Sequence, residues 1–116
     1  MGKSTKKTPK AYQVSLSAIA LQNIDEITGY IAFINRQPLN AIKVGDAIFN
    51  TIERIVLNPF AYKECEELPT KTKKYRRAIC FSWIIVYKIT RNEIRILGII
   101  HSSRKPSKIK ALKKAK

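Results

Sequence analysis

His101 is the only histidine in the chain, and it ends the apolar segment ILGIIH immediately before a basic run. The ordinary pKa of an imidazole lies near neutrality, so this side chain can give or take a proton in general acid–base catalysis. Arg104 follows three residues later and would bring a guanidinium beside the imidazole if a turn ends the strand. The pair could act on a phosphate backbone or bind an acidic partner, although a lone histidine at a strand end more often has a structural role.

A second group of candidate residues lies in the segment KTKKYRR, residues 71–77, which holds five basic side chains and no acid. Arginine binds phosphates and carboxylates through paired hydrogen bonds. Because side chains alternate along a strand, Arg76 and Arg77 should point to opposite faces. The alternative role is a solvated basic edge that prevents strand-to-strand aggregation. The residues that we predict to bind a target or nucleic acid are Lys71, Lys73, Lys74, Arg76, Arg77, His101, Arg104 and Lys105.

The remaining reactive side chains form no catalytic or metal-binding motif. Cys65 and Cys80 do not have metal-ligand spacing, which predicts two small buried thiols suited to a reducing cytoplasm. Glu64, Glu66 and Glu67 form an acidic cluster in which a carboxylate could act as a base, although a solvated loop is the expected role. We therefore expect no metal, no cofactor and no small-molecule ligand.

The net charge of +15, from 23 Lys and Arg against 8 Asp and Glu, is far above that of an ordinary small domain. Residues 1–11, 71–77 and 104–116 hold 16 of the 23 basic residues and no acid. Charge segregated in this way implies an acidic or polyanionic partner. No apolar run is long enough to span a bilayer and no apolar signal follows the basic N-terminus, so we expect a cytoplasmic protein without membrane contact.

The first half of the sequence predicts a strand followed by two helices. AYQVSL alternates apolar and polar residues as a half-buried strand does, and Ser17 then has the position of a helix N-cap. Apolar residues spaced by three and four predict one amphipathic helix to about Asn35 and another from Pro38 to the LNP at 57–59. The short connection makes them an antiparallel hairpin. The predicted core residues are Leu21, Ile24, Ile27, Ile31 and Ile34 in the first helix and Ala41, Ile48, Ile52 and Ile55 in the second.

The second half predicts three strands, at residues 75–80, 83–89 and 94–101, with connections short enough for hairpins. Trp83 and Tyr87 share one face of the middle strand and are expected in the core. The predicted fold is a two-layer α+β sandwich in the order β-α-α-β-β-β, ending in a three-stranded antiparallel meander. The last two strands are apolar on both faces, and one helix hairpin covers only one face. We expect the other face to be covered by the C-terminal tail or by a partner, and we favour the partner.

Composition divides the chain into three parts. Residues 1–11 are polar and rich in lysine, which predicts a disordered basic arm. Residues 12–106 form a single domain, because their hydrophobic content is enough for one small core. Residues 107–116 form a basic C-terminal tail, in which Ile109 and Leu112 suffice for one short helix.

Four segments, taken in order, resemble the ParE/RelE superfamily of bacterial toxins from type II toxin–antitoxin modules. They are YQVSLSAIALQNIDEITGYIA, PLNAIKVGDAIFNTIERIVLNP, YRRAICFSWIIVYKI and IRILGIIHSSRKP, and they extend from about Tyr12 to Pro106. The most specific features are GYIA in the first helix, NP after the second, IIVY on the middle strand and the terminal His-x-x-Arg. The resemblance implies a small basic α+β toxin that a cognate acidic antitoxin neutralises.

The superfamily divides in activity, so the resemblance leaves the target open. ParE-like members inhibit DNA gyrase by binding, whereas RelE-like members resemble ribosome-dependent mRNA endoribonucleases, also called mRNA interferases. In a nuclease, His101 would be the general acid, Arg77 and Arg104 would stabilise charge, and the lysines of residues 71–74 would clamp the substrate. The ParE-like function is favoured, because WIIVYKI is apolar where many nucleases carry a catalytic arginine, and no aromatic residue follows His101. A basic RNA-binding domain without toxicity is a third possibility.

Overall fold

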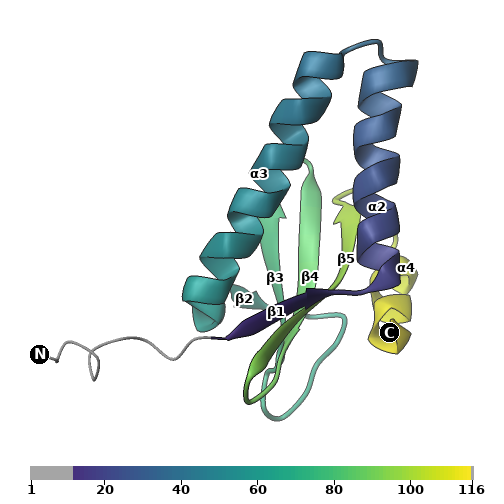
Figure 1. Ribbon diagram of the computed structural model, residues 1–116. Helices are drawn as coiled ribbons and strands as arrows, with labels where there is room; N and C mark the ends of the chain where they lie inside the picture. The colour runs from purple at the N-terminus through teal and green to yellow at the C-terminus, as the bar shows by residue number, and fades with distance from the viewer. Residues whose placement is uncertain (1–11, 116) are drawn as a thin grey trace, which may run out of the picture.

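The computed structural model describes residues 12–115, which form a five-stranded sheet with a helix hairpin on one face (Figure 1). The predicted basic arm, residues 1–11, lies outside the described residues. The strands are β1 (Gln13–Leu16), β2 (Lys63–Glu64), β3 (Tyr75–Cys80), β4 (Trp83–Ile89) and β5 (Glu93–His101). The helical elements are α2 (Ala18–Gly29), the π-helical turn η1 (Tyr30–Ile34), α3 (Pro38–Leu57), the 3₁₀ turn η2 (Pro59–Ala61), α4 (Pro106–Ala111) and the 3₁₀ turn η3 (Leu112–Lys114). The predicted α+β class is confirmed.

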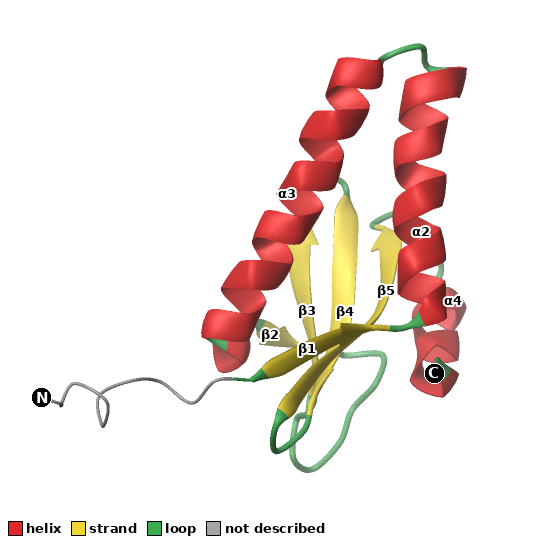
Figure 2. Ribbon diagram, viewed as in Figure 1, coloured by secondary structure: helices red, strands yellow, loops and turns green. Residues whose placement is uncertain are grey.

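Local sequence signals set the ends of the two long helices. Ser17 Oγ accepts a hydrogen bond from the Ala20 amide at 2.9 Å, which caps α2, and donates to the Leu97 carbonyl at 2.8 Å. This one side chain therefore both starts the helix and ties it to β5. Pro38 occupies the first turn of α3, where no amide hydrogen is needed, and Asn58 caps its end. The predicted antiparallel helix hairpin is confirmed and stands over the sheet (Figure 2).

The strand order in the sheet is β1-β5-β4-β3-β2. β3, β4 and β5 form the predicted antiparallel meander, with a register shift between Val86 and Tyr87. β1 pairs in parallel with β5, so that Gln13 lies beside Glu93. The two-residue β2, in a stretch predicted to be irregular, extends the sheet beyond β3. The first and last strands of the described chain are therefore neighbours.

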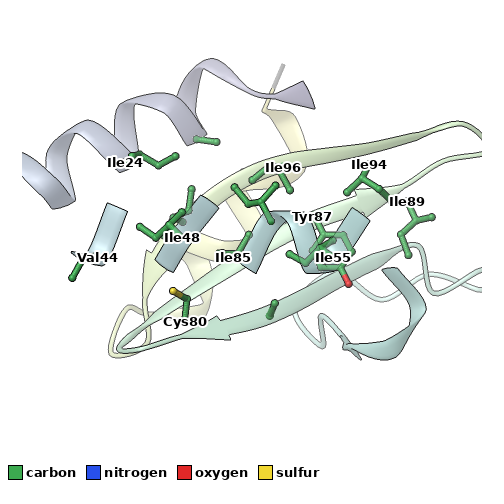
Figure 3. Close-up of a cluster of buried hydrophobic side chains, with 14 of the residues drawn as sticks. Ile24, Val44, Ile48, Ile55, Cys80, Ile85, Tyr87, Ile89, Ile94 and Ile96 are labelled. Carbon is green, nitrogen blue, oxygen red and sulfur yellow. The ribbon is translucent and has the colours of Figure 1, made fainter. Parts of the chain in front are cut away.

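The face of the sheet beneath the hairpin holds the larger hydrophobic core (Figure 3). All four core residues predicted for α3 are buried, and Val44 and Thr51 join them. From the first helix, the predicted residues Ile24 and Ile31 are buried, and Ile27 packs against this core. Figure 3 shows the side chains of both helices meeting those of β4 and β5. The hairpin is therefore attached to the sheet along one face by apolar contacts.

Leu21 and Ile34 are corrections to the predicted core, because 51% and 65% of their surfaces are exposed. The buried row of α2 begins at Ala20 instead of Leu21. Ile34 is the last residue of the π-helical turn η1, in which the Asn35 amide donates to the carbonyl five residues earlier, so the α-helical spacing no longer holds. The exposed large apolar residues at this end of the hairpin are Tyr30, Phe33, Ile34, Leu39 and Ile42.

The opposite face of the sheet is covered by the chain itself, which corrects the favoured prediction of a partner and agrees with the alternative, the C-terminal tail. α4 and η3 bury Ile109 and Leu112 there, in a second cluster that also contains Cys65 and Leu68 from the segment after β2. Gly98 leaves room for this cover, since a Cβ at that position would lie 2.6 Å from a methyl carbon of Leu112. The prediction of one short basic helix in the tail is confirmed.

Candidate functional site

The residues predicted to bind a target divide between the two ends of the sheet. His101 ends β5 opposite Trp83, beside the turn that joins β3 to β4. The lysine loop, residues 71–74, precedes β3 at the other end, where the Ile89 amide donates to the Lys74 carbonyl at 2.7 Å. Because a strand rises about 3.4 Å per residue, the six residues of β3 span about 17 Å between these two ends. The structure therefore does not bring the lysine loop and the histidine together.

The imidazole of His101 is exposed but is held by its neighbours. Its Nδ1 lies 2.8 Å from Ser103 Oγ and accepts a hydrogen bond from the Ser103 amide at 3.1 Å. Since Nδ1 is an acceptor, the neutral ring carries its proton on Nε2. The ring also meets the Trp83 indole edge to face, with ring centres 5.9 Å apart. These contacts fix the orientation of the imidazole at the end of β5.

A turn after β5 leads the chain along a groove between the sheet and α2. The Arg104 amide donates to the His101 carbonyl at 2.9 Å, so the expected turn is present. The groove has a volume of about 1120 Å³. Its apolar lining includes Ile27, Tyr30 and Trp83, and its polar lining includes Glu26, His101, Arg104, Lys105 and Lys108. An apolar surface beside clustered cations suits an amphipathic segment that carries acidic residues.

Arg76 lies on the hairpin side of β3 and is bonded within the fold. Its guanidinium donates to the carbonyls of Lys73 and Tyr62 at 2.8 Å each and to that of Phe60 at 3.3 Å. The guanidinium also lies 5.1 Å from the centre of the Phe60 ring. Arg76 therefore holds the lysine loop and the segment after η2 against β3.

Arg77 lies on the opposite face, as the alternation of side chains predicts. It is the register partner of Val86, which belongs to the cluster under α4. His101 lies on the hairpin face, since its ring contacts Trp83, which packs against the larger core. The sheet therefore separates the Arg77 guanidinium from the imidazole. Of the three residues predicted for a ribonuclease site, His101 and Arg104 share the groove and Arg77 does not.

Two buried groups away from the groove have raised pKa values. Burial raises the pKa of the Cys65 thiol to about 11, and the Glu67 carboxylate beside it adds to the rise. Burial also raises the pKa of the Tyr87 hydroxyl, which donates to the Pro59 carbonyl at 2.6 Å. Because a thiol reacts as its thiolate, the raised pKa makes Cys65 a poor nucleophile. The predictions that both cysteines are buried and that Tyr87 is in the core are confirmed.

The hairpin side of the groove was not predicted from the sequence. Tyr30 is 57% exposed there, and Asn23 Oδ1 accepts a hydrogen bond from the Ile99 amide at 2.9 Å at the groove's edge. The one available signal was GYIA, which contains Tyr30 but does not reveal the π-helical turn.

Among residues 12–115, no group of three or more His, Cys, Asp or Glu side chains could hold a metal ion. No helix in the same range is long and apolar enough to cross a membrane.

A helix hairpin on a five-stranded mixed sheet, in the order β-α-α followed by an antiparallel meander, is the RelE/ParE-like α+β fold. The family described as "ParE toxin of type II toxin-antitoxin system, parDE" matches residues 14–106, and the chain belongs to this family. Members of the family pair with an antitoxin. The resemblance inferred from the sequence is confirmed.

One solved structure, titled "Chromosomal ParDE TA system from P. aeruginosa", is similar in fold with a TM-score of 0.62. It is 17% identical in sequence, and the similarity covers 80% of this chain and 98% of that chain. At this identity the likeness concerns the fold. No curated protein sequence matches the chain.

Proposed function

We propose that this ParE-family toxin acts in the cytoplasm by binding and inhibiting DNA gyrase, and that it does not cut RNA. The observation that supports this most strongly is the separation of the side chains that a nuclease would need. Arg77 lies across the sheet from His101, and Arg76 is bonded to backbone carbonyls. The ribonuclease hypothesis places Arg77, His101 and Arg104 around one phosphate. Arg77 lies outside the groove, in which His101 is accompanied by Arg104 and two lysines.

The groove supports a second part of the proposal, that it receives an acidic segment of the cognate antitoxin. Trp83 and Ile27 offer apolar contact to one side of such a segment. Arg104, Lys105 and Lys108 offer charge to the other side. A segment that folds on binding could bury its apolar residues and pair its carboxylates at once.

Purified protein tests the choice of target. Incubation with gyrase, ATP and supercoiled plasmid should yield linear DNA after protein denaturation, because a trapped cleavage complex leaves both strands cut. A parallel incubation with translating ribosomes should leave mRNA intact. Cleavage of mRNA that disappears in His101→Ala would contradict the proposal and favour the ribonuclease. Absence of both effects, with no growth defect on expression, would favour a non-toxic RNA-binding domain.

The groove is tested by titration with the antitoxin. Arg104→Glu and Lys108→Glu should weaken the complex, since both reverse a charge that lines the groove. Lys43→Glu is a matched control, because Lys43 is exposed on α3 outside the groove lining. Equal weakening by all three variants would show that net charge alone, and not the groove, determines binding.

A further inference from the structure

Charge is divided unequally between the two halves of the fold. Residues 12–62, which contain β1 and the helix hairpin, hold three basic and four acidic residues. Residues 63–115, which contain the rest of the sheet and the tail, hold fifteen basic and four acidic residues. The hairpin half is thus nearly neutral. The positive charge is concentrated on the sheet, its loops and the C-terminal helix.

Part of this charge forms one surface on the side of the sheet away from the hairpin, which we call the cationic face. Its residues come from β3, β4, β5, α4 and η3, and they are Arg77, Lys88, Arg95, Lys110, Lys113 and Lys114. Arg77 pairs with Val86 and Lys88 pairs with Tyr75, and both partners belong to the cluster on this side. Lys110, Lys113 and Lys114 are exposed on the helical segment whose Ile109 and Leu112 face the sheet.

Two cations of this face are direct neighbours. Lys88 and Arg95 are direct partners on adjacent strands, an arrangement in which like charges repel. Three carboxylates belong to segments that border the face, namely Glu93 at the start of β5 and Glu66 and Glu67 next to the buried Cys65. Glu93 accepts a hydrogen bond from Ser15 Oγ at 2.6 Å, and Arg95 donates to the same hydroxyl at 3.0 Å. Glu67 lies beside the buried Cys65. Three carboxylates against six cations leave a positive excess, which an anionic partner would neutralise.

We propose that the cationic face binds the phosphate backbone of duplex DNA. The cations are spread over a surface and do not converge in a pocket, which suits a partner with regularly repeated charges. Double-stranded DNA carries one negative charge per about 1.7 Å of its axis, and each cation that contacts a phosphate releases bound counterions. This contact would belong to the toxin alone and is separate from its binding to gyrase.

A duplex fits this face better than a single strand does. Proteins that bind single strands offer exposed aromatic rings on which bases stack. The aromatic residue in the cluster on this side is Tyr75, which is 4% exposed. The ammonium groups of Lys74 and Lys88 lie 5.7 and 6.0 Å from the centre of its ring. The described part of the face therefore presents charge for phosphates and no open ring for a base.

Fluorescence anisotropy with the full chain and a short labelled duplex, over a series of salt concentrations and without gyrase, tests the proposal. The first variant combines Lys110→Gln, Lys113→Gln and Lys114→Gln. The matched control combines Arg36→Gln, Lys43→Gln and Arg54→Gln, which removes the same charge from exposed positions on the hairpin half. A second variant, Lys88→Gln with Arg95→Gln, tests the sheet itself. Thermal melts followed by circular dichroism establish that each variant folds.

The wild type should bind the duplex with an affinity that falls linearly in a log–log plot against salt. The tail variant should lose about tenfold or more in affinity, and its salt slope should fall by about 1 for each phosphate that the variant no longer neutralises. The hairpin control should lose less than about twofold. The sheet variant should also bind the duplex more weakly than the wild type.

Four results would overturn the proposal. The first is no binding of the duplex at low salt. The second is an equal loss in the tail variant and the hairpin control, since net charge alone would then explain binding. The third is tighter binding of a single-stranded RNA of the same length. The fourth is displacement of the duplex by polyglutamate at equal charge concentration, which would identify the partner as an acidic polypeptide.

Discussion

The two faces of the sheet are closed in different ways. The hairpin face has a core of sixteen buried residues, to which two long helices without net positive charge contribute. The opposite face has eight, of which α4 and η3 supply Ile109 and Leu112. The rest of that short helical segment carries lysines. One face therefore provides most of the hydrophobic stability, while a thin cover on the other closes the sheet and keeps positive charge at the surface.

Ile48→Ala should have the largest effect on stability. Ile48 is fully buried in α3, and its truncation leaves a cavity between the hairpin and the sheet. We expect a loss of about 3 kcal/mol in the free energy of unfolding, measured by urea denaturation with circular dichroism. Ile42→Ala in the same helix is the control, because Ile42 is 61% exposed, and it should cost less than about 0.5 kcal/mol. Similar losses in both variants would show that the hairpin face does not carry the stability assigned to it.

Leu112→Ala should cost less, about 2 kcal/mol, because the cover on the second face is short and can relax over the gap. The same denaturation experiment measures this loss. Leu57→Ala is the control, since Leu57 is 75% exposed at the end of α3. A loss equal to that of Ile48→Ala would remove the difference between the two faces.

Alkaline pH should weaken the second face through Cys65. The pKa of its thiol is raised from 9.0 to about 11 in the folded state, chiefly by burial. The unfolded chain therefore loses this proton first, and the stabilisation present below pH 9 is lost as the pH rises towards 11. The melting temperature should fall less steeply over this range in Cys65→Ala than in the wild type.

Leu68→Ala is the matched control for this pH series, because it removes a buried side chain of the same cluster that carries no titrating group. The slope of its melting temperature against pH should resemble that of the wild type. If Cys65→Ala and the wild type lose stability in parallel between pH 9 and 11, deprotonation of Cys65 does not contribute to alkaline unfolding.

Phe81→Asn should have the smallest effect and should increase stability. Phe81 has a φ of 54° in the turn between β3 and β4, a left-handed conformation that asparagine adopts more easily than phenylalanine. We expect a gain of about 0.5 to 1 kcal/mol in urea denaturation, because the side chain is exposed and little packing is lost. Ser82→Asn, at the neighbouring position without a positive φ, should show no gain. If Ser82→Asn also raised the free energy of unfolding, the effect of Phe81→Asn would not come from the positive φ of residue 81.

Much of the fold was predictable because its signals are local. The cap at Ser17, the helix start at Pro38 and the limits of β3 and β4 depend on residues next to one another in the chain. The parallel pairing of β1 with β5 was not predicted, since it joins residues far apart in sequence. The cover on the second face was underestimated for a related reason. Two apolar residues in a basic tail look insufficient until Gly98 is known to receive Leu112.

The candidate site was predictable by residue type but not by arrangement. The alternation of strand side chains correctly placed Arg76 and Arg77 on opposite faces. No sequence pattern indicated that Arg76 bonds to the carbonyls of Lys73 and Tyr62, because those contacts depend on the course of the loops. The role of Tyr30 in the groove depends on a π-helical turn, which apolar spacing does not indicate.

The parallel pairing of β1 with β5 also affects how the protein is made. During translation, Gln13–Leu16 leaves the ribosome long before Glu93–His101. β1 therefore cannot pair with β5 until synthesis is nearly complete. The Leu97 carbonyl, which accepts the hydrogen bond from Ser17 Oγ, is also synthesised late. In a nascent chain that lacks β5, β1 therefore has no strand to pair with, and Ser17 has no carbonyl to hold the start of α2. The toxin therefore cannot complete its fold until almost the whole polypeptide has been synthesised.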